Sequence, residues 1–267
     1  VKVLSYKQLV LHSISQLDSM RLLFTKEKVA NLISGINQIK TVNDHFISGG
    51  DCRVFFEIYD EYIRQVELAK KHYMEVNYSD FNFDKDDHYH TMRNNDYAAT
   101  NEELIYRQKK YFKLKMFLSM LDSYSQKEAF LRVKDGINFE FINADQGKNN
   151  NVDFILNAYL SLLDPHSSYM SEFQYESFIS LSNHKLSGIG VELSWNMGYA
   201  KIRKVINGGA AFLQGELAVG DELWAVKKSD GSKISLVGLP LDEIISHVVG
   251  ESGTSIEIEV RRKKGTT

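Results

Sequence analysis

The sequence predicts an α+β protein, in which a helical N-terminal domain is followed by a small β-rich domain. Residues 184–267 hold 12 of the 17 glycines, whereas 27 of the 31 aromatic residues lie before position 184. Apolar residues recur every three or four positions in the first part and alternate with polar ones in the second. A glycine-poor, aromatic-rich region before a glycine-punctuated one indicates helices followed by strands.

The overall composition limits the classes of protein to consider. A length of 267 residues suggests about two domains at roughly 150 residues each. The net charge of -3 gives no basic excess for nucleic acid or anionic lipid. No apolar run approaches the ~18 residues of a membrane span, and no signal peptide is recognisable. The single cysteine, Cys52, excludes an internal disulfide. We also expect no cofactor.

Capping residues and apolar spacing predict the helices in order. Ser5 with Gln8, Thr25, Thr100 with Glu103, and Asn151 are the expected helix starts, and Ser171 begins a short helix. The clearest stripe belongs to a third helix: Phe55, Ile58, Tyr62, Val66, Ala69 and Tyr73. In the helix after Thr100 the expected stripe is Leu104, Tyr111, Leu114, Leu118 and Leu121. Residues 77–99 and 143–150 lack periodicity and are expected to be loops.

The glycine-rich part predicts strands and one helix. Strands are expected over 189–195, 199–206 and 222–226, and the alternation of 256–261 predicts a last one. Pro240 suits the first turn of a helix whose apolar stripe is Leu241, Ile244, Ile245 and Val248. Gly250 stands where a left-handed C-cap is expected.

The segment Ser187-Gly188-Ile189-Gly190-Val191 is the main candidate for chemistry. Two glycines at the start of a strand allow successive backbone N–H groups to turn inward and hold an anion. If the strand lies at a sheet edge, an extended peptide can add to it, with its terminal carboxylate in the glycine loop. Alone, the pattern more often marks a plain glycine turn that enters a strand.

The order of motifs after this segment resembles a PDZ domain of the bacterial, circularly permuted kind. The motifs are Gly208-Gly209-Ala210-Ala211, Leu217-Ala218-Val219-Gly220-Asp221, the helix after Pro240, and Gly250-Glu251-Ser252-Gly253-Thr254. The resemblance covers about 184–262. Ala210 replaces the usual proline of the first motif, and Gly208, Gly220 and Gly253 are expected to serve backbone shape.

Two flanking segments narrow the resemblance. Leu163-Asp164-Pro165-His166-Ser167-Ser168-Tyr169-Met170 resembles the segment before the PDZ domain in carboxy-terminal processing proteases. Leu17-Asp18-Ser19-Met20-Arg21-Leu22-Leu23-Phe24 is similar to a stretch in the helical domain of tail-specific proteases, with Ser19 in place of proline. Together they imply a periplasmic serine protease of the tail-specific branch.

The resemblance implies a domain order and a role for this chain. The expected parts are a helical domain over 1–150, bridging helices over 151–183, the PDZ domain over 184–262, and a chain end over 263–267 leading toward a catalytic domain. In the family a serine nucleophile and a lysine base lie after the PDZ domain, so no catalytic residue is assigned here and the fragment alone is expected to be inactive. It would recruit the free C-termini of protein substrates to the protease.

The residues expected to bind such a peptide lie on two elements. Main-chain pairing is expected along Ile189 to Leu193, the carboxylate would meet the amides near Gly188 to Gly190, and the helix would favour apolar end residues. The full set is Gly188, Ile189, Gly190, Val191, Leu193, Ile244, Ile245 and Val248. Two other functions stay open: a non-catalytic PDZ adaptor, and a PDZ domain whose groove is closed and only structural.

Other patterns are better explained structurally. Asp164, His166 and Ser167 are too close in sequence for a catalytic triad and indicate a turn. The stretch with Asp84, Asp86, Asp87, His88 and His90 is expected to be a solvated loop, so no metal site is predicted. The basic run Arg261 to Lys264 is expected to be a solvated chain end and not a nucleic-acid surface. The sequence does not define the oligomeric state.

Overall fold

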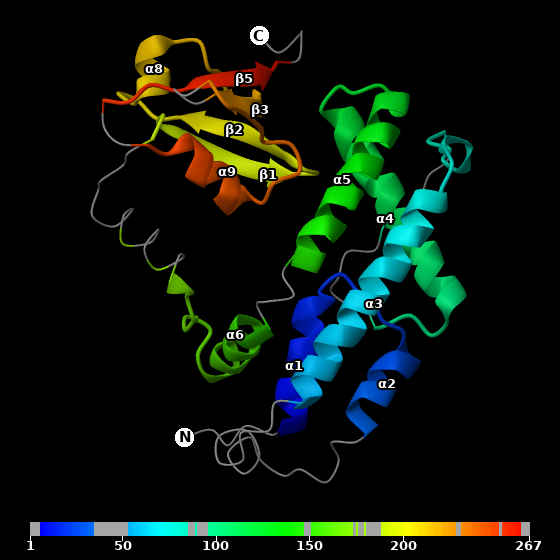
Figure 1. Ribbon diagram of the computed structural model, residues 1–267. Coiled ribbons are helices and arrows are strands. Elements are labelled where there is room, and N and C mark those ends of the chain that lie inside the picture. Colours follow the sequence, from blue (N-terminus) through cyan, green and yellow to red (C-terminus); the bar gives the residue numbers. More distant parts are fainter. Residues whose placement is uncertain are drawn as a thin grey trace. The chain divides into compact units, whose positions relative to one another are not determined.

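The protein divides into two compact units in the computed structural model. One comprises Val1–Lys134 and Ala144–Ser171, and the other comprises Asp135–Asn143 and Glu172–Thr267. The structure describes residues 6–34, 53–84, 89, 96–146, 151–172, 175, 179, 188–227, 231–250 and 253–262. The first unit is helical and the second contains an antiparallel sheet (Figure 1), which confirms the predicted α+β class. The domain boundaries at 150, 183 and 262 stay a prediction.

The helices of the first unit follow the predicted starts closely. They are α1 (Tyr6–Leu17), α2 (Lys26–Ser34), α3 (Arg53–Glu75), a short 3-10 turn (Tyr78–Asp80), α4 (Asn101–Leu121), α5 (Gln126–Gln146) and α6 (Asn151–Leu163). The sequence did not predict α5, whose second half belongs to the other unit. Several predicted features lie outside the described residues. They are the cap at Ser5, Ile36 and Ile39 of the second helix, the segment 147–150, Cys52 and most of the 171–181 helix.

One core of the helical unit joins α1, α2, α3 and α6. Its buried residues are Tyr6, Leu9, Val10, Ile14, Phe24, Val29, Phe55, Ile58, Ile155 and Ala158. Phe55 and Ile58 begin the stripe predicted for α3, and the Tyr6 ring packs edge-on against Phe55 at 5.9 Å between centroids. An edge-to-face aromatic pair adds specificity to the burial of apolar area.

A cluster of aromatic rings packs α3, α4 and α5 together. Phe112 is fully buried, stacks on Phe81 at 5.1 Å between centroids, and lies near Phe130 at 5.6 Å. The stripe predicted for α4 is only partly right: Leu104 is buried, and Tyr111 and Leu114 are half-buried. The buried face is Leu104, Gln108, Phe112, Met116 and Ser119, while Leu118 and Leu121 are exposed. Gln108 is buried because its amide donates to the Leu22 carbonyl at 2.7 Å.

The segment between α1 and α2 is organised by a buried carboxylate. Asp18 accepts hydrogen bonds from the backbone N–H groups of Leu22, Leu23 and Phe24 at 2.7, 3.2 and 3.0 Å. Burial raises the pKa of the Asp18 carboxyl, and the three N–H donors oppose that rise. Arg21 lies at φ 55° and its guanidinium donates back to the Asp18 carbonyl at 2.6 Å. The motif around Asp18 therefore forms a turn that positions Phe24 in the core.

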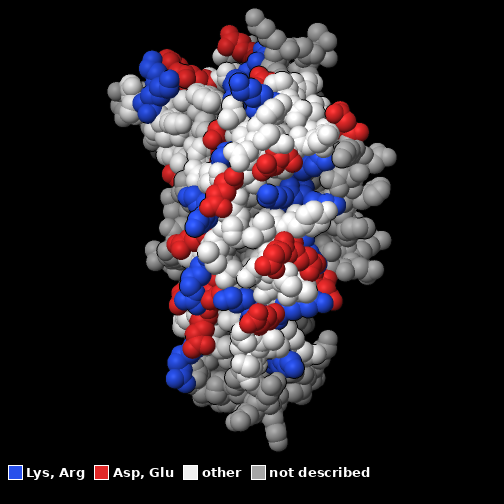
Figure 2. Space-filling model, turned by 90° about the vertical axis from the view of Figure 1, so that its right-hand side faces the viewer, with Lys and Arg blue, Asp and Glu red and all other residues white. Residues whose placement is uncertain are grey.

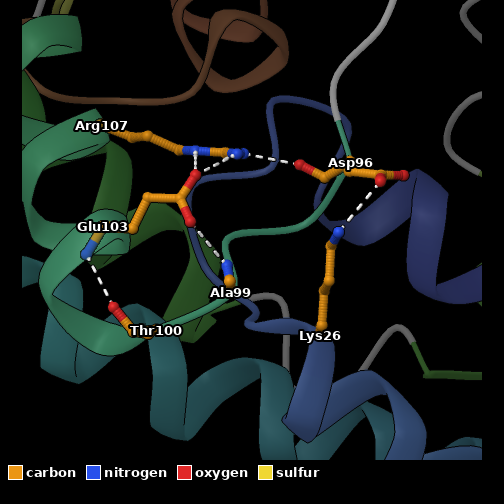
Figure 3. A network of polar contacts seen from close by, with 6 residues as sticks. All are labelled: Lys26, Asp96, Ala99, Thr100, Glu103 and Arg107. Carbon is orange, nitrogen blue, oxygen red and sulfur yellow. Dashed lines mark hydrogen bonds and ion pairs between the residues drawn. The ribbon is translucent and has the colours of Figure 1, made fainter.

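A polar network fixes the start of α4 beside α2 (Figure 3). Thr100 accepts from the Glu103 N–H, as the sequence predicted, and Glu103 in turn accepts from the Ala99 N–H at 2.8 Å. Arg107 binds Glu103 and the Asp96 carbonyl, and Lys26 pairs with the Asp96 carboxylate at 3.0 Å. These contacts satisfy the free N–H groups of the helix start.

The described residues of the sheet unit form five strands and two short helices, besides the second half of α5. They are β1 (Val191–Asn196), β2 (Tyr199–Val205), α8 (Ala210–Gln214), β3 (Glu222–Lys227), β4 (Lys233–Ser235), α9 (Leu241–Val248) and β5 (Glu257–Arg261). The sheet order is β1-β2-β3-β4, and β5 pairs with β3. Among the elements after Gly188, the sequence did not predict β4 and α8. The core beneath includes Ala200, Ile202, Leu223, Val226, Leu236, Ile244 and Val248.

Glycines shape several turns of this unit. Gly208, Gly220 and Gly253 have φ values of 80°, 95° and 90°, as expected for positions that serve backbone shape. Met197 and Gly198 both have positive φ and form the two-residue turn between β1 and β2, a geometry that suits the twist of a hairpin. The predicted left-handed cap at Gly250 is wrong: α9 ends at Val248, and the chain leaves through Val249 in an extended conformation.

Candidate functional site

Strand β1 lies at the edge of the sheet, because it pairs with β2 and with no other described strand. Residues 191 to 196 pair antiparallel with 199 to 205, and the register shifts between Glu192 and Leu193. An edge strand offers unpaired backbone N–H and C=O groups to a further extended segment. The described part of the chain leaves that edge uncovered by another strand, as the peptide-addition hypothesis requires.

Helix α9 lies beside β1 (Figure 1) and packs on the same core. The side chains of Val191, Leu193 and Trp195 are half-buried against this core, whereas Glu192 and Asn196 are exposed. Period-two alternation thus turns every second residue of β1 toward the helix.

The three predicted helix residues differ in exposure. Ile244 is 0% exposed and Val248 is 7% exposed, so both belong to the core beneath the sheet. Ile245 is 43% exposed and offers apolar surface. The half-buried Ile189, Val191 and Leu193 offer the rest.

The glycine loop before β1 is held by its carbonyl groups. The Ile189 carbonyl accepts from the Ala211 N–H of α8 at 2.8 Å, and the Gly190 carbonyl accepts from the Ile206 N–H at 2.9 Å. In a planar trans peptide the next N–H points opposite to the carbonyl. The N–H groups of Gly190 and Val191 are therefore directed away from α8 and β2. These two amides are oriented to donate to a carboxylate; Gly190 belongs to the predicted set Gly188 to Gly190, and Val191 follows it.

A close contact between two glycines sets this loop geometry. Gly190 has φ 78°, and a Cβ atom there would lie 2.8 Å from the Gly209 Cα. A Cβ at Gly209 would lie 3.0 Å from the Gly190 Cα. No other residue type fits either position without moving the backbone.

Each end of β1 lies near one end of α9. A Cβ at Gly188 would lie 3.8 Å from Val249, next to the C-terminus of α9. At the other end the Trp195 indole N–H donates to the Leu239 carbonyl at 2.9 Å, just before α9 begins. Helix α9 therefore runs antiparallel to β1, and the strand from Ile189 to Trp195 spans about 20 Å at ~3.3 Å per residue.

Two arginines at the end of β5 hold the opposite edge of the unit. Arg262 forms a bidentate pair with the buried Asp221 at 2.7 and 2.6 Å, and Arg261 binds Glu222. Burial opposes ionisation of Asp221, but the Arg262 hydrogen bonds and the Ala218 N–H hold the pKa of that carboxyl below its usual value. Both arginines are exposed, as the predicted solvated chain end requires, but each also pairs with a buried carboxylate. Lys263, Lys264 and the predicted chain end 263–267 lie outside the described residues.

The remaining sequence candidates have structural roles or lie outside the described residues. Asp164 accepts from the His166 N–H and the Ser167 hydroxyl at 3.2 and 3.0 Å, which is the predicted turn. Asp84 is described, but Asp86, Asp87, His88 and His90 are not. Within the described ranges no group of His, Cys, Asp and Glu side chains could hold a metal ion. None of the helices described there is long and apolar enough to span a bilayer.

The charges on the face shown in Figure 2 are interspersed. Basic and acidic side chains alternate across it, and no broad surface of one sign is visible there. Such a surface gives no electrostatic footprint for nucleic acid on this face.

Comparison with known proteins identifies a matching family and two similar proteases. Residues 5–172 match the family described as the tail specific protease N-terminal domain. A tail-specific protease of Haemophilus influenzae is 31% identical over 114 residues, which are 43% of this chain and 16% of that protein. A carboxy-terminal-processing protease of Bartonella bacilliformis is 31% identical over 111 residues, which are 42% of this chain and 24% of that protein.

A solved structure also matches part of the chain. It is the PDZ domain of a carboxy-terminal protease from Vibrio cholerae in complex with a peptide. The match is 31% identical, covers 28% of this chain and 76% of that chain, and has a TM-score of 0.28. The chain thus spans at most 24% of the length of the two curated relatives named above.

Proposed function

The chain belongs to the tail-specific protease family, and on that premise we propose that the groove between β1 and α9 recruits the free C-terminus of protein substrates to a carboxy-terminal processing protease. The membership confirms the family predicted from the motifs around Asp18 and Asp164. The observation that carries the proposal is the uncovered edge strand β1, with the N–H groups of Gly190 and Val191 turned outward at one end.

The proposed mechanism is strand addition with a carboxylate anchor. A substrate tail pairs with the outer edge of β1 and runs antiparallel to it, with its carboxylate at Gly190 and Val191. Gly188 shapes the loop, while Ile189, Val191, Leu193 and Ile245 contact the apolar side chains of the tail. Ile244 and Val248 support them from the core. Two N–H donors to one carboxylate form charge-assisted hydrogen bonds, which are stronger than neutral ones.

The catalytic step belongs, in this proposal, to a serine nucleophile and a neutral lysine base that no residue of this chain supplies. Burial lowers the pKa of a lysine and lets it take the serine proton. The proposed location of the parent protease is the periplasm, following the family resemblance. The domain division predicted from the sequence is kept as part of this proposal.

The test is a titration with an apolar-ended peptide, once as the free acid and once amidated. Trp195 lies along the groove and reports binding by fluorescence, and Trp224→Phe removes the second indole signal while keeping an aromatic ring over Tyr199. Saturable binding of the free acid alone is expected. Equal binding of both peptides would remove the carboxylate anchor from the proposal, and binding of neither would indicate a closed groove. A non-catalytic adaptor would bind the free acid without cleavage by the full-length protein.

A further inference from the structure

The second half of α5 packs into the sheet unit through three glycines. A Cβ atom at Gly198 would overlap Cδ2 of the Phe139 ring, and one at Gly238 would overlap Cδ1. A Cβ at Gly136 would overlap Met197. The Phe139 ring therefore occupies a notch between two backbone segments, and each contact requires a residue without a side chain.

The two segments that form this notch are the ends of the groove walls. Gly198 lies in the turn that follows β1, and Gly238 directly precedes Leu239, whose carbonyl binds Trp195. The Gly238 N–H donates to the Gly198 carbonyl at 2.7 Å. The end of β1 and the segment that leads into α9 are thus joined by two hydrogen bonds, and the Phe139 ring lies against that joint.

We propose that Phe139 is a positioning residue for the peptide groove: its ring fixes the separation of β1 and α9 at the end opposite the glycine loop. The inference rests on the proposed function, since it assigns a role to Phe139 in binding the same peptide. Because the ring packs on Gly198 and Gly238, the packing of residues 135–143 within the sheet unit and the binding of a peptide are thermodynamically linked. Each then favours the other by the same factor.

The first arm of the test is Phe139→Ala, titrated with the free-acid peptide. The affinity is expected to fall about 10-fold, within the range of ordinary coupling between sites. Phe130→Ala is the matched control, because Phe130 lies on the same helix but packs on Phe81 and Phe112 of the helical unit. Phe130→Ala should lower the stability of that unit and leave the peptide affinity unchanged. An unchanged affinity in folded Phe139→Ala would overturn the inference.

The second arm needs no variant and measures hydrogen exchange in the wild-type protein. Saturating peptide should slow the exchange of amides in Asp135–Asn143, while those in 126–134 should exchange as before. Equal exchange in Asp135–Asn143 with and without bound peptide would overturn the inference and leave the proposed function intact. If the wild-type protein binds no peptide, the proposed function fails first and the role of Phe139 falls with it.

Discussion

The helical unit and the sheet unit are stabilised in different ways. In the helical unit large side chains fill the interior, as the rings of Phe55 and Phe112 show. In the sheet unit backbone approaches backbone at Gly190 and Gly209, and the aromatic residues number only four after position 184. The first unit is therefore sensitive to the loss of side-chain volume, and the second to the gain of a single Cβ atom. The difference also explains why the candidate site, which uses main-chain groups, lies in the sheet unit.

The largest expected effect is the loss of a ring from the helical unit. Phe112→Ala should lower the free energy of unfolding of that unit by about 3–5 kcal/mol, because it removes a buried ring and leaves a cavity. Denaturant titration followed by circular dichroism measures the change. Phe117→Ala on the same helix is the control, since Phe117 is 46% exposed and should cost under about 1 kcal/mol. Similar losses for the two variants would contradict the packing described for α4.

The next effect tests the backbone contact in the sheet unit. Gly190→Ala should destabilise that unit by about 3 kcal/mol and abolish peptide binding, because it adds a clash with Gly209 to an unfavourable φ. Gly208→Ala is the matched control: its φ is 80°, but a Cβ there has nothing within 4 Å. It should cost only about 1–2 kcal/mol, from backbone strain. Equal costs would mean that strain alone, without the clash, explains the need for glycine.

A pH-dependent effect separates charge from packing in the sheet unit. Folding lowers the pKa of the Asp221 carboxyl. The pairing of ionised Asp221 with Arg262 therefore stabilises the protein at pH values above the pKa that Asp221 has in the unfolded chain. This stabilisation is lost as the pH falls through the lowered pKa of the folded protein. Arg262→Gln should therefore destabilise the unit at pH 7, and the difference from the wild type should shrink below about pH 4, near the unfolded pKa. Urea titrations at several pH values, read by tryptophan fluorescence, measure this. A difference that does not change with pH would show that Arg262 acts through packing.

The smallest effect is expected at the exposed ion pair in Figure 3. Lys26 and Asp96 have side chains that are 54% and 84% exposed, so Lys26→Ala should change stability by under about 1 kcal/mol. The change should disappear in high salt. A larger loss in thermal unfolding would show that the pair orders the start of α4 more strongly than solvent screening allows.

Sequence reasoning found what depends on local pattern and missed what depends on packing. The helix start at Thr100 and the strand over 257–261 followed from capping chemistry and alternation. The buried face of α4 did not, because Phe112 is selected by rings from other helices. Helix α5 carried a readable signal that was overlooked. Ser125 and Glu128 form a capping box, and Ala129, Phe130, Val133 and Ile137 follow at helical spacing.

The features of the candidate site likewise fall into two groups, those that the sequence predicted and those that required the structure. The glycine loop, the following strand and the apolar helix were all visible in the sequence. The orientation of the Gly190 and Val191 amides was not, because it depends on which groups bind the Ile189 and Gly190 carbonyls. The exposure of Ile245, in contrast to Ile244, also required the three-dimensional packing of α9.

The placement of Phe139 has a consequence for how the chain is made on the ribosome. The ring packs on Gly238, which is translated about 100 residues later, or roughly 5–20 s at ordinary elongation rates. During that interval α5 can form as a helix, yet Gly238, on which the Phe139 ring packs, has not been synthesised. The first segment of the sheet unit, Asp135–Asn143, thus cannot finish packing until the later segment that contains Gly238 has been made. A truncation between the helices and the strands would separate Phe139 from Gly198 and Gly238, the residues on which its ring packs.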